Sequence, residues 1–326
     1  MYEQGVQEIQ RMGVISMNYH IIGDIHGHGD KLEALLQHLG YVRQGGIYQQ
    51  PGAKVVFLGD FIDRGKQHRQ VLGIVKPMVE AGHALAVMGN HEFNAIAYHT
   101  LDPETGKPLR LHTNKNTYQH QAFLDEYQLH DDETREIIDW FKSLPLHLEV
   151  KNEQGRVLLR AVHACWSQPV IECVPEYLDT DYLVKACDET KPEYDHIEVI
   201  LKGPEIDLPE GYSFHDKSKI ERHNIRIKWW DGQGQVTYRD IAMVPEGEEI
   251  KLPDRSVPES QIGNYSYGRN EPPVFFGHYW LTGKPAPIAS NLACLDYSAG
   301  KGGQLVAYHW REGDQALLPE RFVWEQ

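Results

Sequence analysis

The sequence lacks any apolar run long enough to cross a membrane. Its 326 residues are 41% hydrophobic, with a mean hydropathy of -0.51, whereas a spanning helix needs about 18 or more consecutive apolar residues. Residues 1–16 also lack the basic-then-apolar pattern of a secretory signal, and we treat residues 1–17 as an N-terminal extension. These absences predict a soluble, cytoplasmic protein without a membrane partner.

Cysteine and positive charge are also scarce. The four cysteines form no Cys-x-x-Cys pair, which is typical of free thiols in a reducing compartment. Lysine and arginine number 32 against 47 aspartates and glutamates, which gives a formal net charge of -15. A surface of this charge repels polyanions, so we expect no bulk nucleic-acid binding.

Short apolar segments with the composition of β-strands recur along the chain. Four of them read YHIIGD, KVVFLGD, ALAVMGN and VLLRAVH. Between them, apolar residues recur at helical spacing over residues 32–39 and 71–79, and residues 117–142 also look helical. Pro77 should kink or shorten the second of these helices. This alternation predicts an α/β layered domain.

Residues 165–272 have a different character. Proline, glycine and charge are dense there and the apolar periodicity is poor, which predicts a long insertion of loops with a few strands. Such an insertion is either a cap that shapes the substrate entrance or a peripheral elaboration. From about Val274 onward the pattern is again typical of strands. We therefore predict a single domain over residues 18–326, with an insertion at about 165–272.

Polar side chains follow three of the predicted strands directly, in the segments GDIHG (23–27), GDFIDRG (59–65) and GNHE (89–92). Because the carboxyl ends of strands form the ligand crevice in open α/β sheets, we expect these segments to converge. In extended backbone Asp24 and His26 point to the same face, where both can bind one cation. Asp60 has two oxygens and can bridge to a second cation, in the two-metal arrangement that stabilises phosphoryl transfer.

This series, followed by His163 in VHA and by His278 in a Gly-His pair, resembles the calcineurin-like metallophosphoesterases. The resemblance is greatest to the phosphoprotein-phosphatase branch, which also includes symmetrical dinucleoside tetraphosphatases. It covers residues 18–164 and 274–310 and leaves out the insertion. It implies a β-sandwich flanked by helices.

The resemblance also implies a role for each residue of the motifs. In such enzymes a hydroxide that bridges two divalent metal ions attacks phosphorus. His91 would then be the general acid, held by Asp63, while Arg64 and Asn90 would bind phosphate oxygens. The residues implied as ligands of the first metal are Asp24, His26 and Asp60, and those of the second are Asp60, Asn90, His163 and His278.

Several features of the site stay open at this point. Carboxylate, amide and imidazole ligands admit Mn²⁺, Fe, Zn²⁺ or Co²⁺, and we place Mn²⁺ first. Many nucleases of the wider superfamily end in Gly-His-x-His, whereas this chain has Trp280 in place of the second histidine, which favours a phosphatase. The family's second phosphate-binding arginine could be Arg222 or Arg226. Trp229 and Trp230 could stack on a base or belong to the core.

The expected activity is hydrolysis of phosphomonoesters, including Ser, Thr or Tyr phosphate on proteins. The substrate would be a phosphorylated small molecule, a phosphopeptide or a nucleotide. Cleavage of symmetrical dinucleoside polyphosphates is the alternative, because both reactions use the same core motifs. A catalytically silent metal-binding module is the third interpretation, and the presence of Asp63, Arg64 and His91 argues against it.

Overall fold

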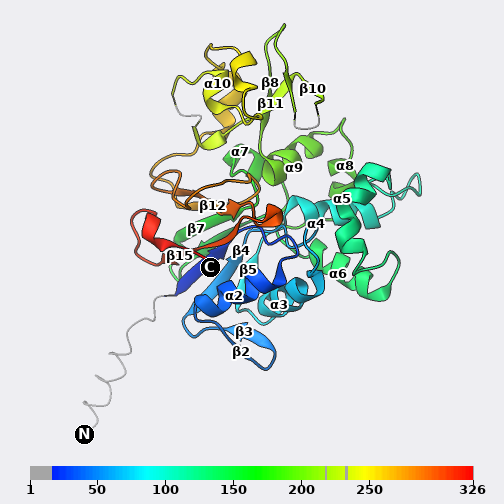
Figure 1. The fold of residues 1–326 in the computed structure, drawn as a ribbon, viewed down its shortest axis with the longest axis vertical. Helices are drawn as coiled ribbons and strands as arrows, with labels where there is room; N and C mark the ends of the chain where they lie inside the picture. The colour runs from blue at the N-terminus through cyan, green and yellow to red at the C-terminus, as the bar shows by residue number, and fades with distance from the viewer. Residues whose placement is uncertain (1–16, 217–218, 232–233, 326) are drawn as a thin grey trace.

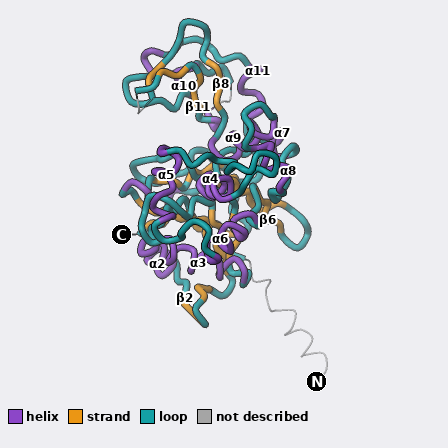
Figure 2. Tube along the Cα trace, turned by 90° about the vertical axis from the view of Figure 1, so that its right-hand side faces the viewer, coloured by secondary structure: helices purple, strands orange, loops and turns teal. Residues whose placement is uncertain are grey.

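Two β-sheets lie face to face in the computed structural model, which describes residues 17–216, 219–231 and 234–325 (Figure 1). The predicted N-terminal extension therefore lies outside the described residues except for Met17. Helices cover the outer faces of the two sheets, and a smaller lobe stands at one end of the molecule (Figures 1 and 2). The predicted α/β fold, a sandwich flanked by helices, is confirmed.

The larger sheet has the strand order β14-β15-β1-β4-β5, with β16 paired to β15. In it β1, β4 and β5 are parallel, and β15 is antiparallel to β1. Its strands are β1 (Asn18–Ile22), β4 (Ala53–Phe57), β5 (Ala84–Ala86), β14 (Asp296–Tyr297), β15 (Gln304–Arg311) and β16 (Phe322–Trp324).

The smaller sheet has the order β13-β12-β7-β6. Here β7, β12 and β13 are parallel and β6 is antiparallel to β7. Its strands are β6 (His147–Lys151), β7 (Val157–Val162), β12 (Val274–Phe276) and β13 (Leu292–Cys294). A separate hairpin pairs β2 (Val42–Gln44) with β3 (Ile47–Gln49).

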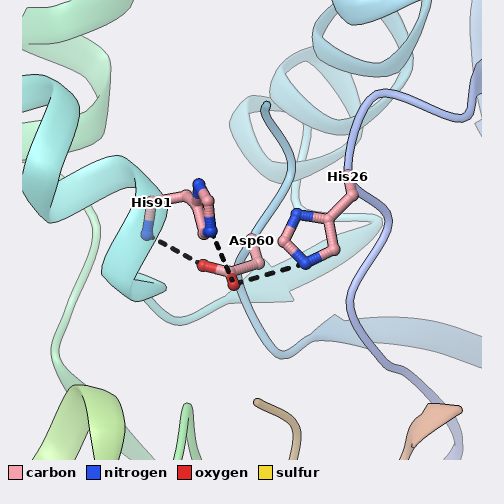
Figure 3. A group of neighbouring side chains, drawn as sticks. All are labelled: His26, Asp60 and His91. Carbon is pink, nitrogen blue, oxygen red and sulfur yellow. Dashed lines mark hydrogen bonds and ion pairs between the residues drawn. The ribbon is translucent and has the colours of Figure 1, made fainter. Parts of the chain in front are cut away.

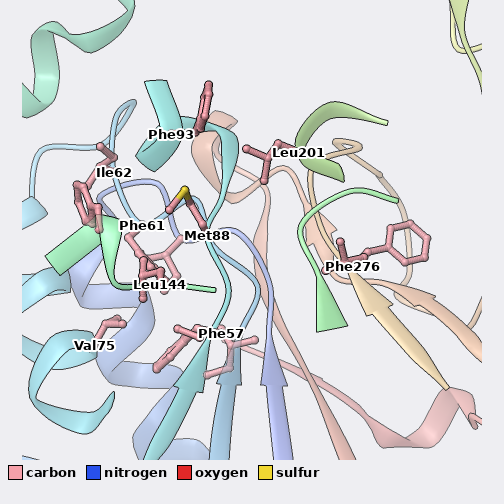
Figure 4. Packing of buried hydrophobic residues seen from close by; sticks show 14 of the residues in the cluster. Phe57, Phe61, Ile62, Val75, Met88, Phe93, Leu144, Leu201 and Phe276 are labelled. Atoms are coloured by element: carbon pink, nitrogen blue, oxygen red, sulfur yellow. The ribbon is translucent and has the colours of Figure 1, made fainter. Parts of the chain in front are cut away.

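Both faces of the central strands are buried, which explains their continuous apolar sequences. Successive side chains of a strand point to opposite faces, so Ile21 packs between the two sheets while Ile22 packs under the helices. On the helix side, Phe57 and Phe61 lie edge to face at 6.1 Å, close to Met88 (Figure 4). This packing fixes the ends of β1, β4 and β5, from which the polar loops begin.

The predicted helices form near their expected bounds, as α2 (Gly29–His38), α3 (His68–Glu80), α5 (Asn114–Leu124) and α6 (Asp132–Lys142). The expected shortening at Pro77 is wrong, because α3 continues to Glu80. Pro77 lies in the last turn, where it removes only one helical hydrogen bond, and its carbonyl accepts from the Ala81 amide. Within the described residues no helix combines the length and apolar character needed to span a bilayer.

The insertion contains more helix than expected. The helices α8 (Thr180–Ala186) and α9 (Pro192–Lys202) join the main core through Leu183, Ile197 and Leu201, and the partly buried side chains of α7 (Gln168–Ile171) pack against it. The strands that follow, together with α10 and α11, enclose their own apolar cluster around Ile206, Ile225 and Leu252. We call this unit the cap lobe. Its elements are β8 (Glu205–Asp207), β9 (Phe214–His215), β10 (Glu221–Arg222), β11 (Asn224–Arg226), α10 (Tyr238–Ile241) and α11 (Glu259–Ile262).

Candidate metal centre

The loops after β1, β4 and β12 have an unusual backbone conformation. His26, Asp60, Asp63, Arg64 and His278 all have positive φ, between 48° and 72°. For residues other than glycine this conformation is uncommon and costs of order 1–3 kcal/mol each where it is strained, and it clusters at functional sites. Five residues that the motifs predict as functional are thus in this backbone conformation.

Two glycines allow separate loops to approach the site carboxylates. A Cβ atom on Gly277 would lie 1.9 Å from Asp24 Oδ1, and a Cβ on Gly89 would lie 2.2 Å from Asp60 Oδ1. Any side chain would therefore push these loops away from the carboxylates. The glycines bring the loop after β12 and the start of α4 (Asn90–His99) against β1 and β4.

Asp60 lies at the middle of the site, between His26 and His91 (Figure 3). Its Oδ2 atom is 3.6 Å from His26 Nε2, 3.4 Å from His163 Nε2 and 4.0 Å from His91 Nε2. These distances are longer than most hydrogen bonds. Two atoms that bind one cation at about 2.1 Å stand about 3.0–3.5 Å apart, so the spacing of Asp60, His26 and His163 suits ions placed between them.

Asp24 and His26 carry buried polar atoms that have no hydrogen-bond partner among the described residues. These atoms are Asp24 Oδ1 and His26 Nε2, and Asp24 Oδ2 is 4.0 Å from His26 Nε2 while accepting from the His278 amide at 3.0 Å. Burial raises the pKa of Asp24 and lowers that of His26 to about 3. A buried carboxylate and a neutral imidazole nitrogen without partners fit a divalent cation.

Asn90, His163 and His278 converge beside Asp60. Asn90 Oδ1 is 2.8 Å from His278 Nδ1 and 3.1 Å from His163 Nε2. The Leu58 carbonyl accepts from His163 Nδ1 at 2.7 Å. Burial lowers the pKa of His163, but the charge of Asp60 outweighs burial and raises it to about 10. The same negative charge would attract a metal ion, which competes with protons for such ligands.

The predicted acid and its partner are in direct contact. His91 Nδ1 lies 2.5 Å from Asp63 Oδ2, and its Nε2 atom is the one near Asp60. The spacing of His26, Asp60 and His91 would also allow the three to bind one ion. The exposed guanidinium of Arg64 is near both His26 and His91. Its positive charge acts to lower the pKa of each imidazole.

Three buried side chains beside the site have no assigned role in the sequence-based prediction. Glu92 accepts hydrogen bonds from the amides of Asp60, Phe61 and Gly89 at 2.7, 2.8 and 3.0 Å. Asp296 accepts from the Trp280 and Ser298 amides, and burial raises the pKa values of Glu92 and Asp296 to about 7 and about 6. The third is His120, whose Nδ1 atom is 2.9 Å from Asp63 Oδ1.

The structure separates the two candidate arginines. Arg226 Nη1 lies 3.3 Å from His278 Nε2, and Glu205 accepts from its Nη2 at 2.8 Å. Arg222 is paired with Asp216, also in the cap lobe. Trp229 is buried and donates to the Ala164 carbonyl at 3.0 Å, so it belongs to the core. The Trp280 ring stacks on His26, with ring centroids 5.2 Å apart.

A cavity of about 850 Å³ lies between the cap lobe and the site. Its inner wall contains His278, Tyr279 and Trp280. The cap lobe contributes basic side chains, acidic side chains and an apolar portion, among them Arg222, Arg226, Lys228, Arg239, Glu205, Glu249, Phe214 and Met243. Pockets that bind small organic molecules have volumes of about 300–1,000 Å³.

Fold and site together define a metallophosphoesterase. The chain belongs to the calcineurin-like phosphoesterase family, whose model matches residues 17–232. The asymmetrical bis(5'-nucleosyl)-tetraphosphatase PrpE of Halalkalibacterium halodurans is 42% identical over 76 residues, which are 23% of this chain and 31% of that protein. This chain thus matches less than a third of that relative's length.

Two further similarities extend over most of the chain. The symmetrical bis(5'-nucleosyl)-tetraphosphatase of Hamiltonella defensa is 24% identical over 324 residues, which cover 93% of this chain and 97% of that protein. A solved structure of a protein serine/threonine phosphatase from Saccharomyces cerevisiae is 15% identical, with a TM-score of 0.50, and the match covers 97% of this chain and 81% of that one. The structural similarity extends the shared fold through both sheets.

Proposed function

We propose that the protein is a metal-dependent hydrolase of phosphoric esters. The observation that carries this proposal is the convergence of partnerless carboxylate and imidazole atoms around Asp60, with the His91–Asp63 pair directly beside them. A fold without catalytic function would have no need for a buried imidazole held by a carboxylate at the edge of such a site. We propose the ligands Asp24, His26 and Asp60 for a first metal ion and Asp60, Asn90, His163 and His278 for a second.

Two divalent ions, Mn²⁺ first among Mn²⁺, Fe, Zn²⁺ and Co²⁺, would supply positive charge for the phosphate oxygens and lower the pKa of the attacking water. The remaining steps belong to side chains of the chain itself. His91, held through Nδ1 by Asp63, donates a proton from Nε2 to the leaving oxygen. Arg64, Arg226 and the Asn90 amide bind the other phosphate oxygens, where a planar guanidinium can make two parallel hydrogen bonds.

Phosphomonoesters are the substrates that we propose, with phosphorylated peptides among them. The cavity beside His278 has room for an organic group attached to the reacting phosphate. We propose that the cap lobe shapes this entrance, as an insertion in a single domain that spans residues 18–326. The acidic segment 246–260 contributes Glu249 to the lining, which disfavours a chain of several phosphates.

Symmetrical cleavage of dinucleoside polyphosphates is the second candidate. It is favoured by the relative from Hamiltonella defensa, because that match extends through the insertion and almost to both ends of the two chains. The basic residues Arg226, Lys228 and Arg239 in the cavity wall would suit additional phosphates.

A substrate panel with the Mn²⁺-loaded protein tests these two candidates against each other. We would compare kcat/KM for phenyl phosphate, a phosphoserine peptide, a phosphotyrosine peptide and diadenosine tetraphosphate. The proposal predicts that the monoesters are hydrolysed faster. A preference of tenfold or more for the tetraphosphate would replace it with the second candidate, and no turnover of any of them would contradict both.

A further inference from the structure

Asp63 is held from two sides by imidazole rings. Its Oδ2 atom contacts His91 Nδ1 at 2.5 Å, and its Oδ1 atom contacts His120 Nδ1 at 2.9 Å. On the far side, His120 Nε2 lies 3.3 Å from His99 Nε2. The side chains of Asp63 and His120 are 4% and 5% exposed, so water cannot readily replace either contact. The four side chains form one continuous row of hydrogen-bonding groups.

Aromatic rings of two helices also hold the His120 ring in place. It belongs to α5 and stacks on Phe123 at 4.8 Å with an interplanar angle of 22°. The rings of Tyr98 and His99, both in α4, lie 5.2 and 5.5 Å from it. Phe123 is fully buried, so the position of His120 follows from the packing of α5 on α4.

The second hydrogen bond restricts the rotation of the Asp63 carboxylate. An ionised carboxylate only accepts hydrogen bonds, so both neighbouring imidazoles must carry their proton on Nδ1. If Oδ1 had no partner, the carboxylate could turn about its Cβ–Cγ bond and carry the His91 ring with it. With both oxygens held, the Nε2 atom of His91 stays directed at the Asp60 side of the site, 4.0 Å from Asp60 Oδ2.

We propose that His120 is a positioning residue for the proton-donating imidazole of His91, on which it acts through Asp63. This inference rests on the proposed phosphoesterase function. Small errors in the placement of a reacting group are costly, because a displacement of about 1 Å can lower the rate by about 10²-fold. His120 would thus set the rate of protonation of the leaving oxygen, without contact to metal or substrate.

Two substitutions separate this role from general support of the fold. His120→Leu removes the donor to Asp63, whereas His120→Asn keeps an N–H group near the position of Nδ1. We expect His120→Leu to lower kcat for phenyl phosphate by about tenfold or more. With 2,4-dinitrophenyl phosphate, whose leaving group needs little protonation, the loss should be below about threefold. KM and bound metal should not change, and His120→Asn should recover most of kcat.

His112→Leu is the matched control. His112 lies in the loop before α5, where it stacks on Tyr98 at 3.8 Å and donates to the Tyr98 carbonyl, and among the described residues no hydrogen bond or ion pair joins it to Asp63. This variant should have the same kcat as the unmodified protein for both substrates. Equal losses with the two substrates in His120→Leu, or no recovery in His120→Asn, would overturn the inference.

A spectroscopic measurement tests the same contact without turnover. In metal-free protein with ¹⁵N-labelled histidine, the proton on His91 Nδ1 should give a low-field ¹H signal that shifts in His120→Leu and stays in place in His112→Leu. An unmoved signal would overturn the inference even if activity falls. If the unmodified protein hydrolyses no phosphoester with any metal, the proposed function is wrong. The catalytic part of this inference is then wrong too. A shifted signal would still identify the His120–Asp63–His91 contact.

Discussion

Asp60 is the residue through which the two proposed metal sites meet. Its Oδ2 atom faces His26, His91 and His163, while its Oδ1 atom accepts from the His91 amide at 2.9 Å. Asp60→Asn keeps the shape of the side chain but removes the negative charge shared by both ions. We therefore expect it to cause the greatest loss of kcat/KM and of bound metal among the site carboxylates. Measurements of metal content and turnover check this result. Asp139→Asn is the control, because Asp139 is an exposed carboxylate paired with Lys142.

His91 is predicted to act as an acid and not as a ligand. His91→Ala should leave the metal content nearly intact and lower kcat by roughly 10²–10⁴. The loss should shrink for substrates with good leaving groups, because these need little protonation. Metal analysis and a leaving-group series of aryl phosphates measure both effects. Loss of a metal ion in this variant would instead assign His91 to the first metal site.

A site residue can be predicted from the sequence when it belongs to a short motif of neighbouring residues. Nine of them lie in short motifs at strand ends. The structure gathers these residues in one region because they follow the carboxyl ends of parallel strands in two sheets that lie face to face. The sequence also indicates a role for Glu92, since an acidic residue three positions after Gly89 is typical of a helix N-terminus. His120 had none, because its contact joins residues 57 positions apart through the packing of two helices.

At the scale of elements, the approach of the β12 loop to β1 depends on Gly277. Gly277→Ala should displace Asp24, since the new Cβ would lie 1.9 Å from its Oδ1 atom, and we expect kcat/KM to fall by about tenfold or more. Gly73→Ala in α3 is the control, because a Cβ there meets nothing within 4 Å. It should keep full activity and raise the free energy of unfolding by about 0.5–1 kcal/mol. Normal activity in Gly277→Ala would contradict the close approach of the loop after β12 to Asp24.

Strand β1 also contains a buried histidine that makes stability depend on pH. Burial, with the charges of His309 and Arg311, lowers the pKa of His20 to about 4, and its Nδ1 atom is 3.0 Å from the Tyr41 hydroxyl. The unfolded chain binds a proton at His20 near pH 6.5 and the folded chain does not. Stability should therefore be complete above pH 6.5 and fall by roughly 2–3 kcal/mol as the pH drops towards 4.

Urea unfolding at pH 4.5, 5.5, 6.5 and 7.5 measures this dependence. His20→Gln should be less stable at pH 7.5 and should depend less on pH below 6.5, because the titrating group is gone. The difference between the two proteins isolates His20 from the other histidines. Equal pH dependence in both would show that His20 does not contribute.

The elements themselves were predictable to different degrees. Apolar spacing predicted α2 and α3, since each buries one face against the larger sheet. Charge and proline surround α8 and α9, so composition predicts loops where these helices form. In α9, however, Pro192 stands at the first turn and acidic residues follow it, which is a typical helix start. Composition averaged over a long window hides short helices of this kind.

For the whole molecule, the position of the cap lobe was the feature that sequence could least predict. The composition of residues 165–272 predicts an insertion, yet nothing in it indicates which side faces the metal centre. In the structure Arg226 reaches His278 because β11 pairs with β8 beside the cavity. Long-range pairing of this kind depends on tertiary packing, so the sequence alone does not show which of Arg222 and Arg226 lies beside His278.

The most direct test of the account is the turnover of p-nitrophenyl phosphate by protein stripped of metal with a chelator and then titrated with Mn²⁺. We predict no turnover in verified metal-free protein, because the attacking water would lack the metal ions that lower its pKa. Activity should return with Mn²⁺ and reach its maximum at two ions per chain. Full turnover after verified metal loss would contradict the proposed two-metal function.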